Sequence, residues 1–143
     1  MTAHKTFAEE FASLLNAEFP ELGLAAAPDR PELEQRRCVS FQVRCPSAAV
    51  ATPLSVVVTE REVAIEFLGA HCRFASAQRA VTQIRAVIDE SVVVDTWYAG
   101  PYRRGCAFAK ASRSPQAPFR ARGVTRIVRR SWSGTHDTSA KVV

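Results

Sequence analysis

The chain has 143 residues, of which 47% are hydrophobic and 23% are charged, and this composition favours one soluble globular domain. No apolar run reaches the roughly 20 residues of a bilayer span, and the first ten residues lack the apolar core of a signal peptide. We therefore expect a cytoplasmic protein with no membrane partner.

The net charge of +5 is divided unevenly along the chain. Residues 1–100 carry nine Lys or Arg against thirteen Asp or Glu, whereas residues 101–143 carry ten Lys or Arg against one acid, Asp137. A surface of one sign attracts a partner of opposite sign over roughly 8 Å at physiological salt. The last third of the chain is therefore where a partner is expected to bind.

The first predicted element is a helix that Thr6 caps, with Glu9 completing a capping box. Phe7, Phe11 and Leu15 continue it on one apolar stripe, and Pro20 ends it. A loop over residues 21–35 follows. Three strands are expected next, and they are Arg37–Cys45, Leu54–Thr59 and Glu62–Leu68, of which the last two form an antiparallel hairpin.

The second predicted helix begins after Ser76 and carries an apolar stripe from Ala77 to Ile88. Beyond it, β-branched and aromatic residues predict a strand over Val92–Tyr98, which Gly100 and Pro101 end. Two more strands, Cys106–Ala111 and Val124–Trp132, flank a loop rich in Ser, Pro and Arg. The predicted fold is α+β, with one antiparallel sheet of five or six strands and two helices packed on one face. Residues 1–132 form a single domain in this prediction, and residues 133–143 form a flexible tail.

The basic last third interleaves Arg with aromatic residues, and such surfaces have three interpretations. Arg offers a planar fork for carboxylate or phosphate, and Arg and aromatic side chains are enriched where proteins bind one another. The same residues could stack on single-stranded nucleic acid, or they could form a solvated face above an aromatic core. The expected contact residues are Tyr102, Arg103, Arg104, Arg120, Arg122, Arg126, Arg129, Arg130 and Trp132.

His71 and Cys72 stand before the second predicted helix, at a junction that often carries functional side chains. Together with Cys106 or His136 they could form a zinc site, but the spacing fits no standard pattern, and no metal or other cofactor is predicted. No two of the four cysteines form a CxxC pair. Reduced, mainly buried thiols are therefore expected at Cys38, Cys45, Cys72 and Cys106.

The segment Ser131–Asp137 contains Ser, His and Asp, the residue types of a hydrolase triad. No GxSxG motif accompanies them, and three close neighbours in sequence rarely meet at one reacting atom. The favoured interpretation is a strand that ends in a turn at Gly134, with Trp132 packed inward and Thr135 or Asp137 bonded to the turn backbone.

The run Phe67-Leu-Gly-Ala-His71-Cys-Arg-Phe74, the amphipathic helix after it and the late run Arg130–Asp137 resemble a group of small bacterial α+β proteins. Some of these are similar to immunity proteins that accompany contact-dependent or polymorphic toxins. The resemblance covers roughly residues 54–137 and implies a protein that binds another protein without catalysis. In that group a second His or an acid is expected near His71, where this chain has Cys72 and Arg73. Immunity proteins are often acidic, so the basic last third implies an acidic partner here.

The sequence therefore predicts a non-enzymatic binding protein that engages an acidic protein partner. The first alternative is a nucleic-acid-binding protein, and the second is a small enzyme that uses His71 or His136. The sequence specifies neither the partner nor the oligomeric state.

Overall fold

The computed structural model describes residues 6–22 and 39–142. In chain order the elements are α1 (Phe7–Glu18), the 3-10 turn η1 (Pro20–Leu22), β1 (Val39–Val43), β2 (Leu54–Val58), β3 (Val63–Phe67), β4 (Ala70–Phe74), α3 (Ala77–Ile88), β5 (Val92–Ala99), β6 (Tyr102–Lys110), β7 (Arg126–Arg130) and β8 (Thr138–Lys141). The α+β class is confirmed. The prediction of one sheet with five or six strands is wrong, because the eight strands form two antiparallel sheets of four, ordered β1-β2-β3-β4 and β6-β5-β7-β8.

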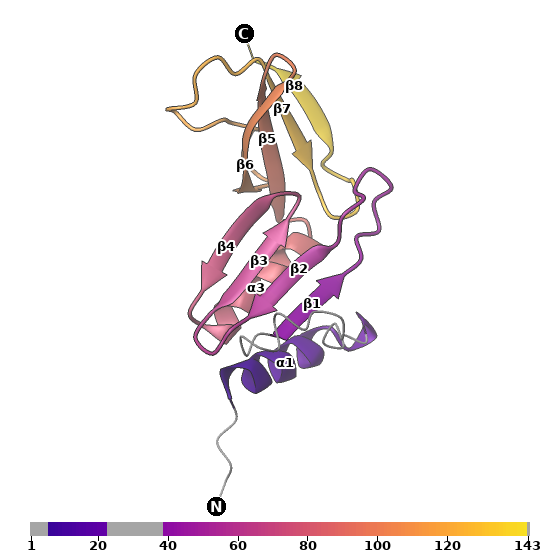
Figure 1. Ribbon diagram of the computed structural model, residues 1–143. Helices are drawn as coiled ribbons and strands as arrows, with labels where there is room; N and C mark the ends of the chain where they lie inside the picture. Colours follow the sequence, from indigo (N-terminus) through magenta and orange to yellow (C-terminus); the bar gives the residue numbers. More distant parts are fainter. Residues whose placement is uncertain (1–5, 23–38, 143) are drawn as a thin grey trace, which may run out of the picture.

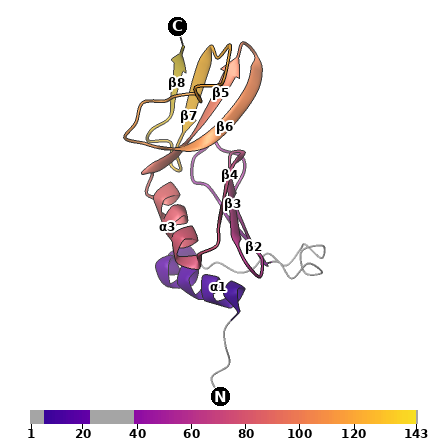
Figure 2. The same ribbon diagram turned by 90° about the vertical axis from the view of Figure 1, so that its left-hand side faces the viewer.

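The two sheets lie end to end rather than face to face, with the second sheet beyond the turn that joins β3 to β4 (Figure 1). Helix α3 lies along one face of the first sheet, and α1 crosses the end of that layer away from the second sheet (Figure 2). Phe11 of α1 contacts Phe41 of β1 at a ring-centroid distance of 6.0 Å. Trp132 extends this core toward the second sheet, where its ring lies 5.5 Å from that of Phe67.

Both helices begin as the sequence predicts. The Thr6 hydroxyl accepts a hydrogen bond from the Glu9 amide, and the Glu9 carboxylate accepts one from the Thr6 amide, so the capping box is present. The Ser76 hydroxyl accepts a bond from the Arg79 amide at the start of α3. The predicted stripe of α3 is buried against the first sheet at Ala77, Ala80, Val81, Ile84 and Val87. No helix within residues 6–22 and 39–142 is long and apolar enough to cross a membrane.

Strand β4 is absent from the sequence prediction, which places His71 and Cys72 at a strand-to-helix junction. The strand pairs antiparallel with β3 through a two-residue turn, in which Leu68 has φ +55° and Gly69 has φ +88°. Two successive positive φ values define the tight hairpin turn that suits the twist of paired strands. Leucine seldom adopts such a conformation, so the residue types at this turn gave no local signal for the hairpin.

Strand β8 lies within residues 133–143, the segment predicted as a tail. It pairs antiparallel with β7, from Arg126 opposite Lys141 to Arg129 opposite Thr138. Its residues, Thr-Ser-Ala-Lys, are all exposed and carry no apolar alternation. Its pairing with β7 is therefore what makes this segment a strand.

One face of the second sheet is covered by the loop over residues 111–125, which leaves the sheet between β6 and β7 (Figures 1 and 2). Under this loop, Asp95 accepts two hydrogen bonds from Arg129, at 2.7 and 2.9 Å, and both side chains are buried. Arg129 also donates to the carbonyl oxygens of Ala111 and Arg113, at 3.3 and 2.6 Å. A buried ion pair thus ties the loop to the sheet.

Candidate functional site

Two of the nine predicted contact residues are buried. Arg129 is 5% exposed and is committed to Asp95, and Trp132 is 7% exposed and packs on Phe67. Neither side chain is available to a partner. Arg130 is half-buried and lies 3.7 Å from a carboxylate oxygen of Asp137.

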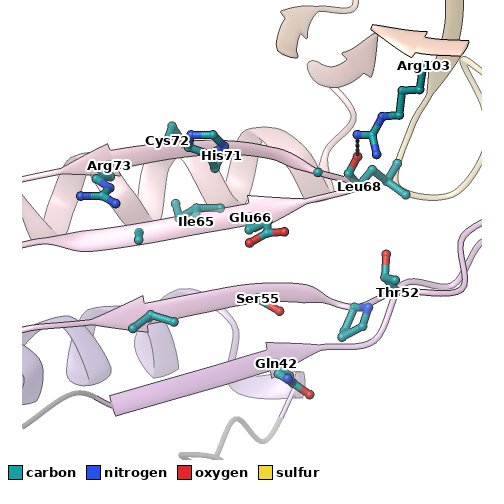
Figure 3. A pocket seen from close by; sticks show the side chains of 14 residues that line it. Gln42, Thr52, Ser55, Ile65, Glu66, Leu68, His71, Cys72, Arg73 and Arg103 are labelled. Atoms are coloured by element: carbon teal, nitrogen blue, oxygen red, sulfur yellow. Dashed lines mark hydrogen bonds between the residues drawn. The ribbon is translucent and has the colours of Figure 1, made fainter. Parts of the chain in front are cut away.

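Arg103 joins the two sheets. Its Nη2 donates to the carbonyl oxygen of Leu68 at 3.2 Å and approaches the Sγ of Cys106 at 3.0 Å. Figure 3 shows its side chain reaching from the second sheet to the turn at Leu68. Arg103 therefore holds the sheets together and exposes the rest of its guanidinium group.

Four residues lie in one row across the second sheet, on the face opposite the loop. Tyr98 of β5 stands opposite Arg103 of β6 and Arg126 of β7, and Arg126 in turn stands opposite Lys141 of β8. Directly opposed residues point to the same face with Cβ atoms roughly 5 Å apart. The Arg126 guanidinium lies over the Tyr98 ring, 4.6 Å from its centroid. We call Arg103, Tyr98, Arg126 and Lys141 the cationic row.

The cationic row contains a like-charge pair. Arg126 and Lys141 face each other directly, and like charges in opposed positions weaken a sheet. Within the part of the chain that the structure describes, neither residue has an ion pair with an acid. The row thus carries three cations, one of which lies against the Tyr98 ring, and no ion pair among the described residues involves any of the three.

The other predicted contact residues lie beside the row or on the loop. Tyr102 follows the β5–β6 turn and is 72% exposed. Arg104 is exposed at the register shift in β6, where Trp97 pairs with Gly105 and Tyr98 with Arg103. Arg120 and Arg122 are exposed on the loop over residues 111–125, which covers the other face of the sheet. The predicted set is therefore divided between two faces.

Tyr98 and Lys141 are not among the contact residues that the sequence predicts. The sequence of a strand does not tell which face Tyr98 points to, and Lys141 falls in the predicted tail. Only the pairing register of β5, β7 and β8 brings them into the row.

A groove of about 790 Å³ lies on the outer face of the first sheet, on the side away from α3 (Figure 3). Four polar residues cross its floor as direct neighbours on β1 to β4, in the order Gln42, Ser55, Glu66 and His71. Arg103 overhangs one end of the groove. The outer face of an antiparallel sheet is commonly polar, so this row alone does not define a site.

The groove residues do not have the order of a hydrolase triad. In such a triad the imidazole lies between the hydroxyl and the carboxylate. Here Glu66 lies between Ser55 and His71, which are two strands apart and therefore separated by roughly 9–10 Å. His71 cannot take a proton directly from Ser55 in this arrangement.

The segment Ser131–Asp137 forms the predicted turn. An Asp137 carboxylate oxygen accepts a bond from the Ser131 amide at 2.9 Å, and the Ser131 hydroxyl accepts one from the His136 amide at 2.9 Å. Gly134 has φ +89° in this turn. The Ser131 hydroxyl and the Asp137 carboxylate are thus engaged with the turn backbone.

Glu90 clamps the same turn from the end of α3. Its Oε1 accepts hydrogen bonds from the amides of Ser133 and Thr135, at 2.9 and 3.3 Å. Burial alone would raise the pKa of Glu90, but the hydrogen bonds from Ser131, Ser133 and Thr135 together lower it to about 2. Glu90 therefore stays ionised and holds the chain beyond β7 against α3.

The three cysteines that the structure describes, Cys45, Cys72 and Cys106, are free thiols, and Cys38 lies outside the described residues. Burial raises the pKa of Cys72 to about 11 and also raises that of Cys45, whose thiol donates to the carbonyl oxygen of Trp132. No group of three or more His, Cys, Asp or Glu within residues 6–22 and 39–142 is placed to hold a metal ion.

Compared with protein-family models, curated proteins and solved structures, the chain matches none. The chemistry of the cationic row itself is therefore the basis for its function.

Proposed function

We propose that this protein binds an acidic protein through the cationic row and the neighbouring side chains of Tyr102 and Arg104. The observation that supports this most is the pairing of Arg126 with Lys141. Two opposed cations weaken the sheet that carries them, and a local rule broken in this way is typical of a functional surface. A carboxylate-rich partner would supply the missing negative charge.

The shape of the row also favours a protein partner. It spans four strands of a sheet, roughly 14 Å at about 4.8 Å per strand, and presents a broad face rather than a pocket. Arg and Tyr are enriched among the residues that dominate protein interfaces. The resemblance of residues 54–137 to immunity proteins fits a binding role, and an immunity function remains part of this proposal.

Affinity capture from the native lysate tests the proposal, with the lysate split into nuclease-treated and untreated halves. The bait is the wild-type chain or the variant Arg126→Glu/Lys141→Glu, which replaces one like-charge pair by another and also removes the contact of Arg126 with the Tyr98 ring. The variant Arg61→Glu/Arg79→Glu is the control, since it changes the net charge equally at two exposed positions away from the row, one in the β2–β3 connection and one in α3.

The proposal predicts an acidic protein that the wild-type and control baits retain after nuclease treatment and that the row variant loses. Loss of all retained protein on nuclease treatment would instead support the nucleic-acid alternative. That alternative also predicts an affinity for a generic oligonucleotide that falls steeply with salt. A protein retained equally by all three baits would contradict the assignment to the row.

A further inference from the structure

The most exposed aromatic side chain of the described residues lies at the tip of the loop over residues 111–125. Phe119 is 103% exposed, as open as in an extended peptide, and so contributes nothing to the folded core. It sits in a tight turn closed by a hydrogen bond of 2.8 Å from the Ala121 amide to the carbonyl oxygen of Pro118. Aromatic side chains are enriched in protein interfaces, and this ring has two exposed arginines and an apolar hollow beside it.

The loop that carries Phe119 is held at its two ends, at its start by Arg129 and at its end by the Thr125 amide, which donates to the carbonyl oxygen of Tyr98 at 2.8 Å. Arg129 donates from the sheet to the carbonyl oxygens of Ala111 and Arg113, and the Arg113 amide donates to the carbonyl oxygen of Lys110 at 3.1 Å. Prolines within the loop restrict its backbone further. The loop therefore presents Phe119 in an ordered conformation, and binding of a partner requires little additional loss of conformational entropy.

Two cations and an apolar hollow lie around the Phe119 side chain. Arg120 and Arg122 are exposed next to Phe119, and no ion pair within the described chain involves them. A shallow hollow of about 390 Å³ lies beside the turn and is lined in part by Pro118, Ala121 and Val142. These features complement a partner segment that offers apolar side chains to the ring and the hollow, and carboxylates to the two arginines.

We infer that Phe119 is an anchor residue that packs against apolar side chains of an acidic protein segment, with Arg120 and Arg122 pairing with carboxylates beside them. This inference rests on the proposed function and adds a second contact region on the loop. A lipid surface is the less favoured occupant. Stable membrane anchoring needs more buried hydrocarbon than one ring supplies, whereas a few aromatic and Arg side chains commonly dominate a protein interface.

A displayed library of random 16-residue peptides, selected at low ionic strength against the wild-type chain, provides a defined probe. The selected peptides are then measured by fluorescence anisotropy against wild type, Phe119→Ala, Phe119→Leu and the row variant Arg126→Glu/Lys141→Glu. Phe119→Ala leaves the unfolding temperature unchanged, since the ring has no internal contact to lose. Peptides rich in Asp and Glu are expected, with an affinity that falls about tenfold or more in Phe119→Ala and less in Phe119→Leu.

The outcomes separate the inference from the proposed function. Acidic peptides that lose affinity with the row variant but not with Phe119→Ala would overturn the inference and leave the proposed function standing. Loss with Phe119→Ala but not with the row variant would support the anchor, because the loop and the row lie on opposite faces of the second sheet and one short peptide need not reach both. Selection without enrichment in Asp or Glu would overturn both. If vesicles of phosphatidylcholine and phosphatidylglycerol at a ratio of about 3:1 retain wild type but not Phe119→Ala, a lipid surface replaces the protein partner.

Discussion

Arg103 and Gly69 are in direct contact across the boundary between the two sheets. The Arg103 guanidinium lies where a Cβ atom on Gly69 would be, and the same group donates to the carbonyl oxygen of Leu68. Glycine suits this position for two reasons. Its backbone is left-handed, with φ +88°, and the absence of a side chain leaves room for the arginine. This contact positions the cationic row relative to the first sheet.

Gly69→Ala should therefore destabilise the protein more than Gly123→Ala does. Both glycines have positive φ, but no heavy atom lies within 4 Å of a Cβ built on Gly123. We expect a loss of about 1–2 kcal/mol from the backbone alone at either position, and about 1 kcal/mol more at Gly69 because Arg103 must give up its hydrogen bonds. Denaturant unfolding measures both, and the extra loss should vanish in an Arg103→Ala background. An equal loss at the two glycines would show that the contact carries no stability.

The buried ion pair of Asp95 and Arg129 predicts a large cost for removing one partner. Asp95→Ala should lower the free energy of unfolding by about 3–5 kcal/mol, because it leaves a buried guanidinium without its counter-charge. The double variant Asp95→Leu/Arg129→Met should recover part of this loss. Chemical denaturation of the two variants tests the difference, and a double variant less stable than Asp95→Ala would contradict it.

The same double variant should loosen the loop. Arg129 holds the carbonyl oxygens of Ala111 and Arg113, so its replacement removes the hydrogen bonds that anchor the loop. Trypsin should then cut faster after Arg120 and Arg122 than it does in the wild-type chain under native conditions. Unchanged rates would show that the loop is held by other contacts.

Glu90 predicts a dependence of stability on pH. Its folded pKa of about 2 lies below the ordinary value of 4.5, so its stabilising effect is present above pH 4.5 and is lost as the pH falls toward 2. Glu90→Gln should lower the free energy of unfolding by about 1 kcal/mol at pH 7, and the difference from wild type should shrink near pH 2. Glu66→Gln is the control, as Glu66 is exposed on the first sheet. A difference that does not change between pH 7 and pH 2 would contradict the clamp.

The thiol of Cys72 should be slow to react. Burial raises its pKa to about 11 from the ordinary 9.0, so less of it is thiolate at pH 8 than in the unfolded chain. Alkylation by iodoacetamide, followed by peptide mass spectrometry, should be about a hundredfold slower in the folded protein than in denaturant. Equal rates in the two states would show that Cys72 is accessible.

Local patterns in the sequence predicted α1, α3, the strands β1, β2, β3, β5 and β7, and the second half of β6. They did not predict β4, since Leu68 stands in a left-handed turn position that other residue types usually occupy. They did not predict β8, which has no apolar alternation. The division into two sheets depends on which strands pair, and period-2 alternation is the same for either arrangement.

The candidate site was predictable as a region but not as a surface. Charge counts located the excess of cations in the last third of the chain. They could not show that Arg129 is buried against Asp95, because that pairing joins residues 34 positions apart. Nor could they show that strand register brings Tyr98 and Lys141 into line with Arg103 and Arg126.

The most direct test of the cationic row is the affinity of the captured acidic protein as a function of salt. Fluorescence anisotropy would compare wild type, Arg126→Glu/Lys141→Glu and the control Arg61→Glu/Arg79→Glu between about 50 and 300 mM NaCl. We predict that wild type and control bind more weakly as salt rises, and that the row variant binds weakly throughout with a flatter slope. The same affinity and the same slope for all three chains would contradict the account.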